Sequence, residues 1–260
     1  MKRQDGSVEW GAFHLSYAGI SDQGRMRTDN EDDFLIMEKQ RLFCLADGMG
    51  GLDEGKLASR TTLEGVARCM HYLADRENST IPFGLTADML GKPELACITS
   101  FANFLVRQKA GGRTMGSTLV AAHFTENRLD FAHVGDSRLY LMRTGELKQL
   151  TEDHSLVNEL YRMGKICKAE MSGHNLRNII SRAIGTHPKV EPDLGSVDVQ
   201  AGDLFLLCSD GLTTMLEPAE IAAIAASGPD TATAAQALIF RANEAGGRDN
   251  ITALLIAVQR

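Results

Sequence analysis

Four aspartates stand at the ends of apolar runs, where a sheet can bring them together. Three such runs lead into Asp47, Asp136 and Asp210, and Asp249 stands just ahead of the run ITALLIAV. In an antiparallel sheet the end of one strand lies beside the start of the next, so these carboxylates can gather at one edge. Converging carboxylates repel one another unless a cation lies among them. The pattern therefore predicts a site for a hard metal ion, built of aspartate oxygens.

A second polar cluster precedes a strand-like run in the block RMRTDNEDDFL. It contains Arg27, followed by the acids Glu31 and Asp32. The planar fork of N–H donors in a guanidinium matches the oxygens of a phosphate, so Arg27 is a candidate phosphate ligand. A surface salt bridge from Arg27 to Asp29 or Glu31 is the alternative interpretation.

Glycines follow Asp47 in the segment DGMGG. Because glycine lets the backbone approach an ion closely, the carbonyl oxygen of Gly48 is a candidate metal ligand. The alternative is a glycine-rich turn that leads into a helix and binds nothing. The Lys and Ser/Thr of a phosphate-binding loop are missing, so this segment does not predict a nucleotide site.

Composition narrows the class of protein. The 260 residues are 43% hydrophobic and 23% charged, which is typical of a globular protein with a substantial core. The net charge of -7 and the lack of a basic run argue against a nucleic-acid partner. Five scattered cysteines without a CxxC pair favour buried thiols in a reducing compartment over zinc ligation. Neither a signal peptide nor a run of the ~20 apolar residues of a membrane helix is present, so we expect a cytosolic protein without membrane insertion.

Short strand-like runs alternate with amphipathic stripes, which predicts an α+β fold. Thr144 and Gly145 lie between two strand-like runs and favour a tight hairpin, hence antiparallel pairing. Helical periodicity marks residues 63–73, 95–106 and 234–242. We expect two central antiparallel β-sheets flanked by helices, a four-layer αββα sandwich. A short helix near Ser155 begins a polar segment at about 152–177 that we interpret as a mobile insertion between strands.

The conjunction of motifs resembles one known family. RTDNED, LADGMGG, TMGSTLV, HVGDSRLY, LTEDHSLV, NIISRAIG, LLCSDGL and GGRDNIT occur in the order and rough spacing of the metal-dependent PPM, or PP2C-type, protein serine/threonine phosphatases. The similarity runs from about Tyr17 to Val258 and favours the bacterial branch. It implies a single phosphatase domain over residues 1–260, in which the insertion at about 152–177 is the flap.

The resemblance also implies roles for individual residues. The ligands of two core ions, Mn2+ or Mg2+, would be Asp47 as the bridging carboxylate, the carbonyl of Gly48, Asp210 and Asp249. Asp136 would bind a weaker third ion.

The remaining residues carried over from the family surround those ions. Glu31 and Asp32 match acids that hold metal-bound waters, and Arg27 matches the arginine that binds phosphate. Met49 departs from the eukaryotic pattern, in which a histidine is the candidate general acid for the leaving hydroxyl. Methionine cannot donate a proton, and His154, His174 and His187 are replacements only by residue type.

The implied function is hydrolysis of phosphoserine and phosphothreonine on proteins by water that two metal ions activate. The expected partner is a phosphorylated protein, a bacterial Ser/Thr kinase or its target, and the expected state is a cytoplasmic monomer. One alternative is a phosphatase of an anti-sigma antagonist, although such members often lack the complete RxxNED block present here. Another is a binding-only pseudophosphatase, which would be expected to lose metal aspartates. A structural calcium-binding protein is disfavoured because local DxDxDG loops are absent.

Overall fold

The structure is a computed structural model that describes residues 1–51, 54–171 and 173–260. Within these residues, the strands make up two antiparallel sheets of six strands each. The first sheet has the order β1-β2-β12-β11-β8-β9; the second has the order β10-β7-β6-β4-β3, with β5 paired to β4.

Strands and helices come in groups along the chain, and each sheet takes its strands from several of these groups. The strands of the first sheet are β1 (Lys2–Trp10), β2 (Phe13–Asp22), β8 (Arg138–Arg143), β9 (Glu146–Gln149), β11 (Leu204–Cys208) and β12 (Ile251–Gln259). Those of the second sheet are β3 (Asp32–Met37), β4 (Leu42–Gly50), β5 (Met115–Ser117), β6 (Leu119–Thr125), β7 (Arg128–Val134) and β10 (Asp193–Asp198). The helices are α1 (Glu54–Ala74), α2 (Ala87–Leu90), α3 (Glu94–Ala110), α4 (Leu156–Arg162), α5 (Lys168–Met171), α6 (Asp210–Thr213), α7 (Pro218–Ser227) and α8 (Thr231–Glu244), and a 3-10 turn spans Glu38–Gln40.

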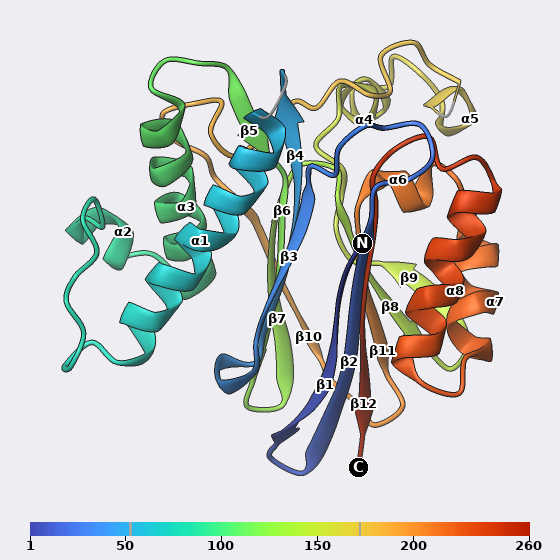
Figure 1. Ribbon diagram of the computed structural model, residues 1–260, viewed down its shortest axis with the longest axis horizontal. Coiled ribbons are helices and arrows are strands. Elements are labelled where there is room, and N and C mark those ends of the chain that lie inside the picture. The colour runs from blue at the N-terminus through green and yellow to red at the C-terminus, as the bar shows by residue number, and fades with distance from the viewer. Residues whose placement is uncertain (52–53, 172) are drawn as a thin grey trace.

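The two sheets pack face to face, and helices cover their outer faces (Figure 1). Helices α1 and α3 lie against the second sheet, and α7 and α8 lie on the opposite side, against the first. Apolar side chains fill all three spaces between layers, because strands buried on both faces present hydrophobic residues to both. The expected four-layer αββα sandwich is confirmed.

Aromatic rings make up much of the layer between the sheets. The ring of Phe124 lies 5.2 Å from that of Trp10, 5.8 Å from that of Phe43 and 5.6 Å from that of Phe205, each in an edge-to-face arrangement. Such pairs add about 0.5–1.5 kcal/mol beyond the free energy of burial. Phe124 comes from the second sheet and Phe205 from the first, so this cluster holds the two sheets together.

Every strand expected from an apolar run is present, and the hairpin between β8 and β9 turns at Thr144 and Gly145. Both residues have positive φ, 50° and 83°, as a two-residue hairpin turn requires. β1, β10 and the three-residue β5 were not predicted. β1 and β10 are edge strands with mostly exposed, polar side chains, so neither shows the apolar run by which the other strands were recognised. β5 is too short to form such a run.

The insertion at about 152–177 lies between β9 and β10. It contains the expected short helix, α4, which begins after Ser155; the Ser155 hydroxyl accepts the amide N–H of Asn158 at 3.4 Å. Ser172, within this insertion, lies outside the described residues. Among the described helices, none combines the length and the apolar content needed to span a membrane.

Replacing Phe124 by alanine should destabilise the protein by about 3–5 kcal/mol, because it leaves a cavity between the sheets. The measurement is the free energy of unfolding from urea denaturation. Phe240→Ala on α8 is the matched control, because that side chain is 58% exposed and its loss should change stability by at most about 0.5 kcal/mol. Equal effects of the two substitutions would contradict this account of the core.

Candidate active site

Asp47 lies near the end of β4, and a threonine holds its backbone on both sides. The Asp47 amide donates to Thr118 Oγ1 at 2.9 Å, and the Thr118 amide donates to the Asp47 carbonyl at 2.8 Å. Thr118 Oγ1 is also 2.7 Å from the hydroxyl of Ser137, the residue that follows Asp136. This chain of hydrogen bonds connects Asp47 on β4 with the loop between β7 and β8 that carries Asp136.

Asp210 and Asp249 come from the other sheet. Asp210 begins α6 just after β11, and Asp249 precedes β12, the antiparallel neighbour of β11. The end of β11 therefore lies beside the start of β12, as the sequence predicted. The structure thus brings together carboxylates that are far apart in the chain.

The aspartates strongly perturb one another. Burial raises the pKa of Asp47 well above its usual value, and the charges of Asp32, Asp210, Asp136 and Asp249 raise it further. Burial, then Asp210, raises the pKa of Asp136 to about 7; burial, then Asp249, raises that of Asp210 to about 6. Buried acids of like charge shift in this direction because the ionised forms are neither hydrated nor neutralised.

This donor set fits hard divalent cations. All of its side-chain donors are carboxylate oxygens, the ligands that Mg2+ and Mn2+ prefer. Two buried oxygens, Asp32 Oδ1 and Asp136 Oδ1, have no hydrogen-bond partner within the described residues. A buried, unpartnered carboxylate oxygen is costly, and a bound cation satisfies it.

Gly48 is required by close packing. A Cβ atom at this position would lie 2.0 Å from the carbonyl oxygen of Gly55 in the first turn of α1, and 2.8 Å from that of Glu31. Both contacts are with backbone, which cannot swing away. Only glycine therefore lets the N-terminal end of α1 approach the end of β4. The Gly48 amide also donates to the Glu31 carbonyl at 3.2 Å.

Glu31 and Asp32 point to different surroundings. The Glu31 carboxylate lies against Gly55 at the N-terminus of α1; burial raises its pKa, and the opposing effects of the Arg27 charge and the Gly55 amide do not cancel this upward shift. Asp32 is buried directly across from Asp47 in the β3–β4 register. Their predicted role, holding metal-bound waters, stays a prediction.

Arg27 pairs with a candidate metal ligand. Its Nη2 donates to Asp249 Oδ2 at 2.6 Å, so the ion pair is not with Asp29 or Glu31, the partners considered from sequence. Its side chain is 48% exposed. Because a guanidinium carries five N–H donors, this one bond leaves others for a phosphate.

Asn250 has a positioning role that sequence reasoning missed. Its side-chain oxygen accepts the amide of Glu31 at 2.9 Å, and its Nδ2 donates to the carbonyls of Gln23 and Asp29 at 2.9 and 2.8 Å. Asn250 therefore ties the loop that carries Arg27 to the start of β12. Its place beside Asp249 in the motif RDN was the available signal; the loop contact was not readable from it.

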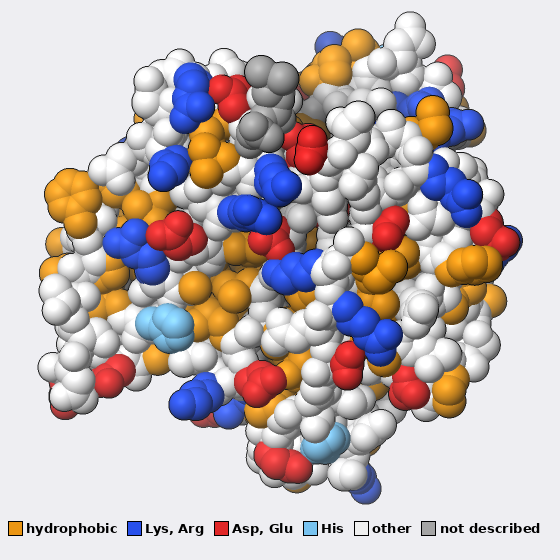
Figure 2. Space-filling model, in the orientation of Figure 1, with side chains coloured by type: hydrophobic (Ala, Val, Ile, Leu, Met, Phe, Trp, Pro, Cys, Tyr) orange, Lys and Arg blue, Asp and Glu red, His pale blue; other side chains and the backbone are white. Residues whose placement is uncertain are grey.

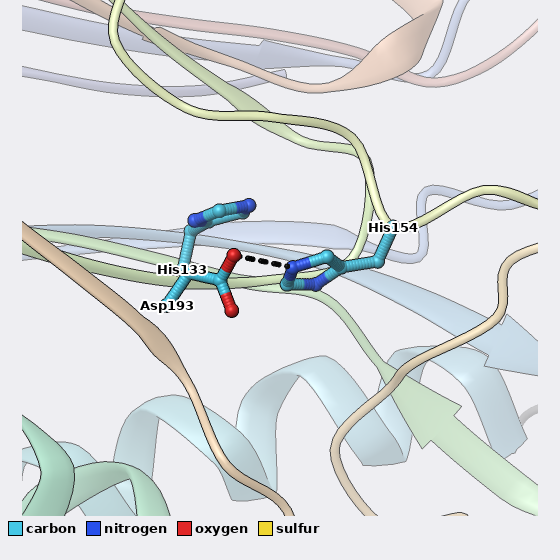
Figure 3. A group of neighbouring side chains, drawn as sticks. All are labelled: His133, His154 and Asp193. Atoms are coloured by element: carbon cyan, nitrogen blue, oxygen red, sulfur yellow. Dashed lines mark ion pairs between the residues drawn. The ribbon is translucent and has the colours of Figure 1, made fainter. Parts of the chain in front are cut away.

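A second group of possible ligands contains His133, His154 and Asp193 (Figure 3). Among the described residues, it is the one set of three His, Cys, Asp or Glu side chains whose ligand atoms all lie within 4.8 Å of one another. The aspartates of the candidate active site are spread more widely, so a single ion could not take all of them.

The tautomer of His154 argues against a metal at this second group. His154 Nδ1 accepts the Gly135 amide at 3.0 Å, so in the neutral ring Nε2 carries the proton and points toward Asp193 Oδ2, 3.3 Å away. A protonated nitrogen cannot ligate. Burial, then His133 and Arg182, lowers the pKa of His154 to about 4, so the ring is neutral near pH 7. A neutral ring has no acidic proton to give at that pH, which also makes His154 unsuitable as the general acid.

Other surface features do not coincide with the aspartate cluster. A cavity of about 460 Å³ lies between the start of α3 and strands β6, β7 and β10, and is lined by Glu94, His123 and Leu194 among others. On the face shown in Figure 2, basic and acidic side chains are interspersed and neither sign forms a continuous patch. This face therefore offers no extended basic surface.

Comparisons with known proteins agree with this geometry. A family model described as Protein phosphatase 2C matches residues 23–251. The serine/threonine phosphatase stp of Listeria innocua is 39% identical over 242 residues, covering 91% of this chain and 93% of the Listeria protein. The structure of the Mycobacterium tuberculosis serine/threonine phosphatase PstP/Ppp is similar with a TM-score of 0.78 and 35% identity, covering 95% of this chain and 99% of that chain.

A further structure concerns the metal directly. The catalytic domain of the serine/threonine phosphatase PstP, solved in complex with two manganese ions, is similar with a TM-score of 0.77 and 34% identity, covering 96% of this chain and all of that chain (100%). The family match spans most of the sequence, and the fold is that of these phosphatases. The chain belongs to the protein phosphatase 2C family and is a metal-dependent protein serine/threonine phosphatase.

Proposed function

We propose that this phosphatase uses the aspartate cluster as its catalytic centre. The two core ions would be held by Asp47, the Gly48 carbonyl, Asp210 and Asp249. Asp136 would hold a weaker third ion: its buried Oδ1 has no hydrogen-bond partner within the described residues, and burial, then the charge of Asp210, raises the pKa of its carboxyl. The observation that carries the proposal is the convergence of carboxylates from both sheets, among which Asp47, Asp136 and Asp210 have a raised pKa because of burial and of the charges of neighbouring aspartates.

When bound, divalent ions at these oxygens lower the pKa of a water and neutralise charge on the phosphate. The residues of the chain do the remaining work. Arg27 binds the non-bridging phosphate oxygens and orients the phosphoserine or phosphothreonine. Asn250 holds the Arg27 loop against β12, so that the guanidinium and the aspartates keep a fixed separation. Stabilisation of charge on those oxygens is the main source of catalysis in phosphoryl transfer.

The leaving hydroxyl needs a proton that Met49 cannot supply. The buried His154 ring is neutral near pH 7, because burial lowers its pKa to about 4, and His187 Nδ1 is 3.0 Å from the Thr186 hydroxyl. We assign this proton to water and not to a histidine.

The substrate is proposed to be a phosphorylated protein, either a bacterial Ser/Thr kinase that this phosphatase opposes or a target of that kinase. Residues 1–260 are proposed to form one phosphatase domain, with the flap at about 152–177. The alternatives, an anti-sigma antagonist phosphatase and a binding-only pseudophosphatase, are not favoured, because the relatives are named serine/threonine phosphatases. Use of Mn2+ or Mg2+, a monomeric state and a cytoplasmic location remain parts of the proposal.

Asp47→Asn should lower kcat on a phosphothreonine peptide by more than about 100-fold, because the variant loses a carboxylate that would hold the metal ions. EDTA should abolish wild-type turnover, and Mn2+ should restore it. Asp33→Asn is the matched control: Asp33 is the neighbour of Asp32 on β3 but pairs with Lys2 at the surface. Wild-type turnover by the Asp47→Asn protein with Mn2+ would refute the assignment.

Arg27→Lys should raise KM about tenfold and change kcat less, because a lysine keeps the charge but loses the fork that binds two phosphate oxygens. Steady-state kinetics with the same peptide measure this. Arg25→Lys, an exposed substitution in the same loop, should leave both constants unchanged. An unaltered KM in the Arg27 variant would remove Arg27 from the phosphate site.

In EDTA, the melting temperature should fall between about pH 5 and pH 8. The folded-state pKa values of Asp136 and Asp210, about 7 and about 6, lie above the ordinary value of 3.8, so the folded state binds more protons than the unfolded state in this range. The stability they contribute is complete below about pH 4 and is lost as the pH rises through 6–7. Excess Mn2+ should flatten the fall, since ions bind the ionised carboxylates. A melting temperature that rises with pH in EDTA would contradict the raised pKa values of Asp136 and Asp210.

A further inference from the structure

Two hydroxyl groups on the side of the first sheet donate hydrogen bonds to one carboxylate of the second sheet. Ser209 Oγ and Thr252 Oγ1 both donate to Asp32 Oδ2, each at 2.7 Å. Asp32 lies on β3, Thr252 lies on β12, and Ser209 directly follows β11. All three are buried. We call Asp32, Ser209 and Thr252 the hydroxyl clamp; it connects the two sheets beside the aspartate cluster.

The clamp is the end of a longer chain of donors. Asn30 Nδ2 lies 2.8 Å from Ser21 Oγ, which lies 2.8 Å from Thr252 Oγ1. Because a hydroxyl has one proton, and Thr252 gives its own to Asp32, the Ser21 hydroxyl must donate to Thr252 and accept from Asn30. Every proton in this chain points toward the Asp32 carboxylate. Hydrogen bonds aligned in this way strengthen one another.

The clamp residues are also neighbours of the proposed metal ligands. Asp32 is the register partner of Asp47 across β3 and β4, so the two side chains share a face of the sheet. Ser209 precedes Asp210, and Thr252 lies three residues after Asp249, in β12. One set of hydrogen bonds therefore holds residues that lie close to Asp47, Asp210 and Asp249.

Sheet packing alone does not account for these residues. A buried carboxylate with its hydrogen-bond partners is commonly no more stable than apolar side chains of the same volume. Asp32 Oδ2 is satisfied by the two hydroxyls, whereas Asp32 Oδ1 has no partner in the described part of the chain. The arrangement holds one oxygen still and leaves the other available.

We propose that Ser209 and Thr252 are positioning residues for the catalytic centre: through Asp32 they hold the carboxylates of the second sheet in register with those of the first. This inference rests on the proposed function, because it assumes that those carboxylates bind ions together. Loss of a clamp hydroxyl should weaken metal binding without removing any ligand.

The test is Mn2+ binding by the metal-free protein, measured by titration calorimetry, which does not depend on turnover. Thr252→Val removes the hydroxyl and keeps the side-chain shape, and it should raise the Kd for Mn2+ about tenfold, as loss of a group that supports a ligand does. Thr252→Ser keeps the hydroxyl and should bind nearly as the wild type does. Ser209→Ala should also weaken binding, and it decides the question if Thr252→Val does not fold, since it leaves the Thr252 bond in place.

Thr99→Val is the matched control. The Thr99 hydroxyl is buried in α3 and donates to the Leu95 carbonyl at 2.7 Å, so its loss should lower the melting temperature but not the affinity for Mn2+. Wild-type affinity in Thr252→Val and Ser209→Ala would overturn the proposal, as would an equal loss in Thr99→Val. Turnover of a phosphothreonine peptide by the wild type is scored separately: selective loss of Mn2+ affinity without any wild-type turnover would support the clamp and refute the catalytic assignment.

Discussion

Repulsion between buried carboxylates is the constraint on which the rest of this structure depends. Asp47 belongs to one sheet and Asp210 and Asp249 flank strands of the other; burial, and then the charges of neighbouring aspartates that include Asp210 and Asp249, raise the pKa of Asp47. Side chains that repel cannot assemble themselves. The two sheets must hold them together, so the aromatic packing between the sheets and the hydrogen bonds at their edge also determine the geometry of the active site.

The backbone around Asp47 shows how this is achieved. Thr118 holds the Asp47 peptide units on both sides, and Glu31 accepts the amide of Gly48. The N-terminal end of α1 packs so closely on Gly48 that no side chain fits there. The helical layer is therefore part of the support of the proposed catalytic centre, because α1 packs on the end of β4 that carries Asp47.

The position of one proton decides whether the His133, His154 and Asp193 group can bind a metal ion. Its ligand atoms are closer together than those of the aspartates, and distance alone would favour it as a metal site. The Gly135 amide fixes the tautomer of His154 and removes that possibility. The hydrogen bond from the Gly135 amide to His154 ties the base of the flap to the loop before Asp136, and His154 Nε2 lies 3.3 Å from Asp193 Oδ2 on β10.

The sequence by itself determined the fold class, the family and the candidate ligands. Apolar runs ending in aspartate are local signals, and antiparallel pairing turns them into a shared edge. Edge strands β1 and β10 were missed because they bury too little to need an apolar pattern. Only the tertiary structure decided that Arg27 pairs with Asp249, that Asn250 holds the Arg27 loop, and that Asp32 is gripped by Ser209 and Thr252. These contacts join residues more than 170 positions apart, and short polar side chains do not show in the sequence which distant partner they will meet.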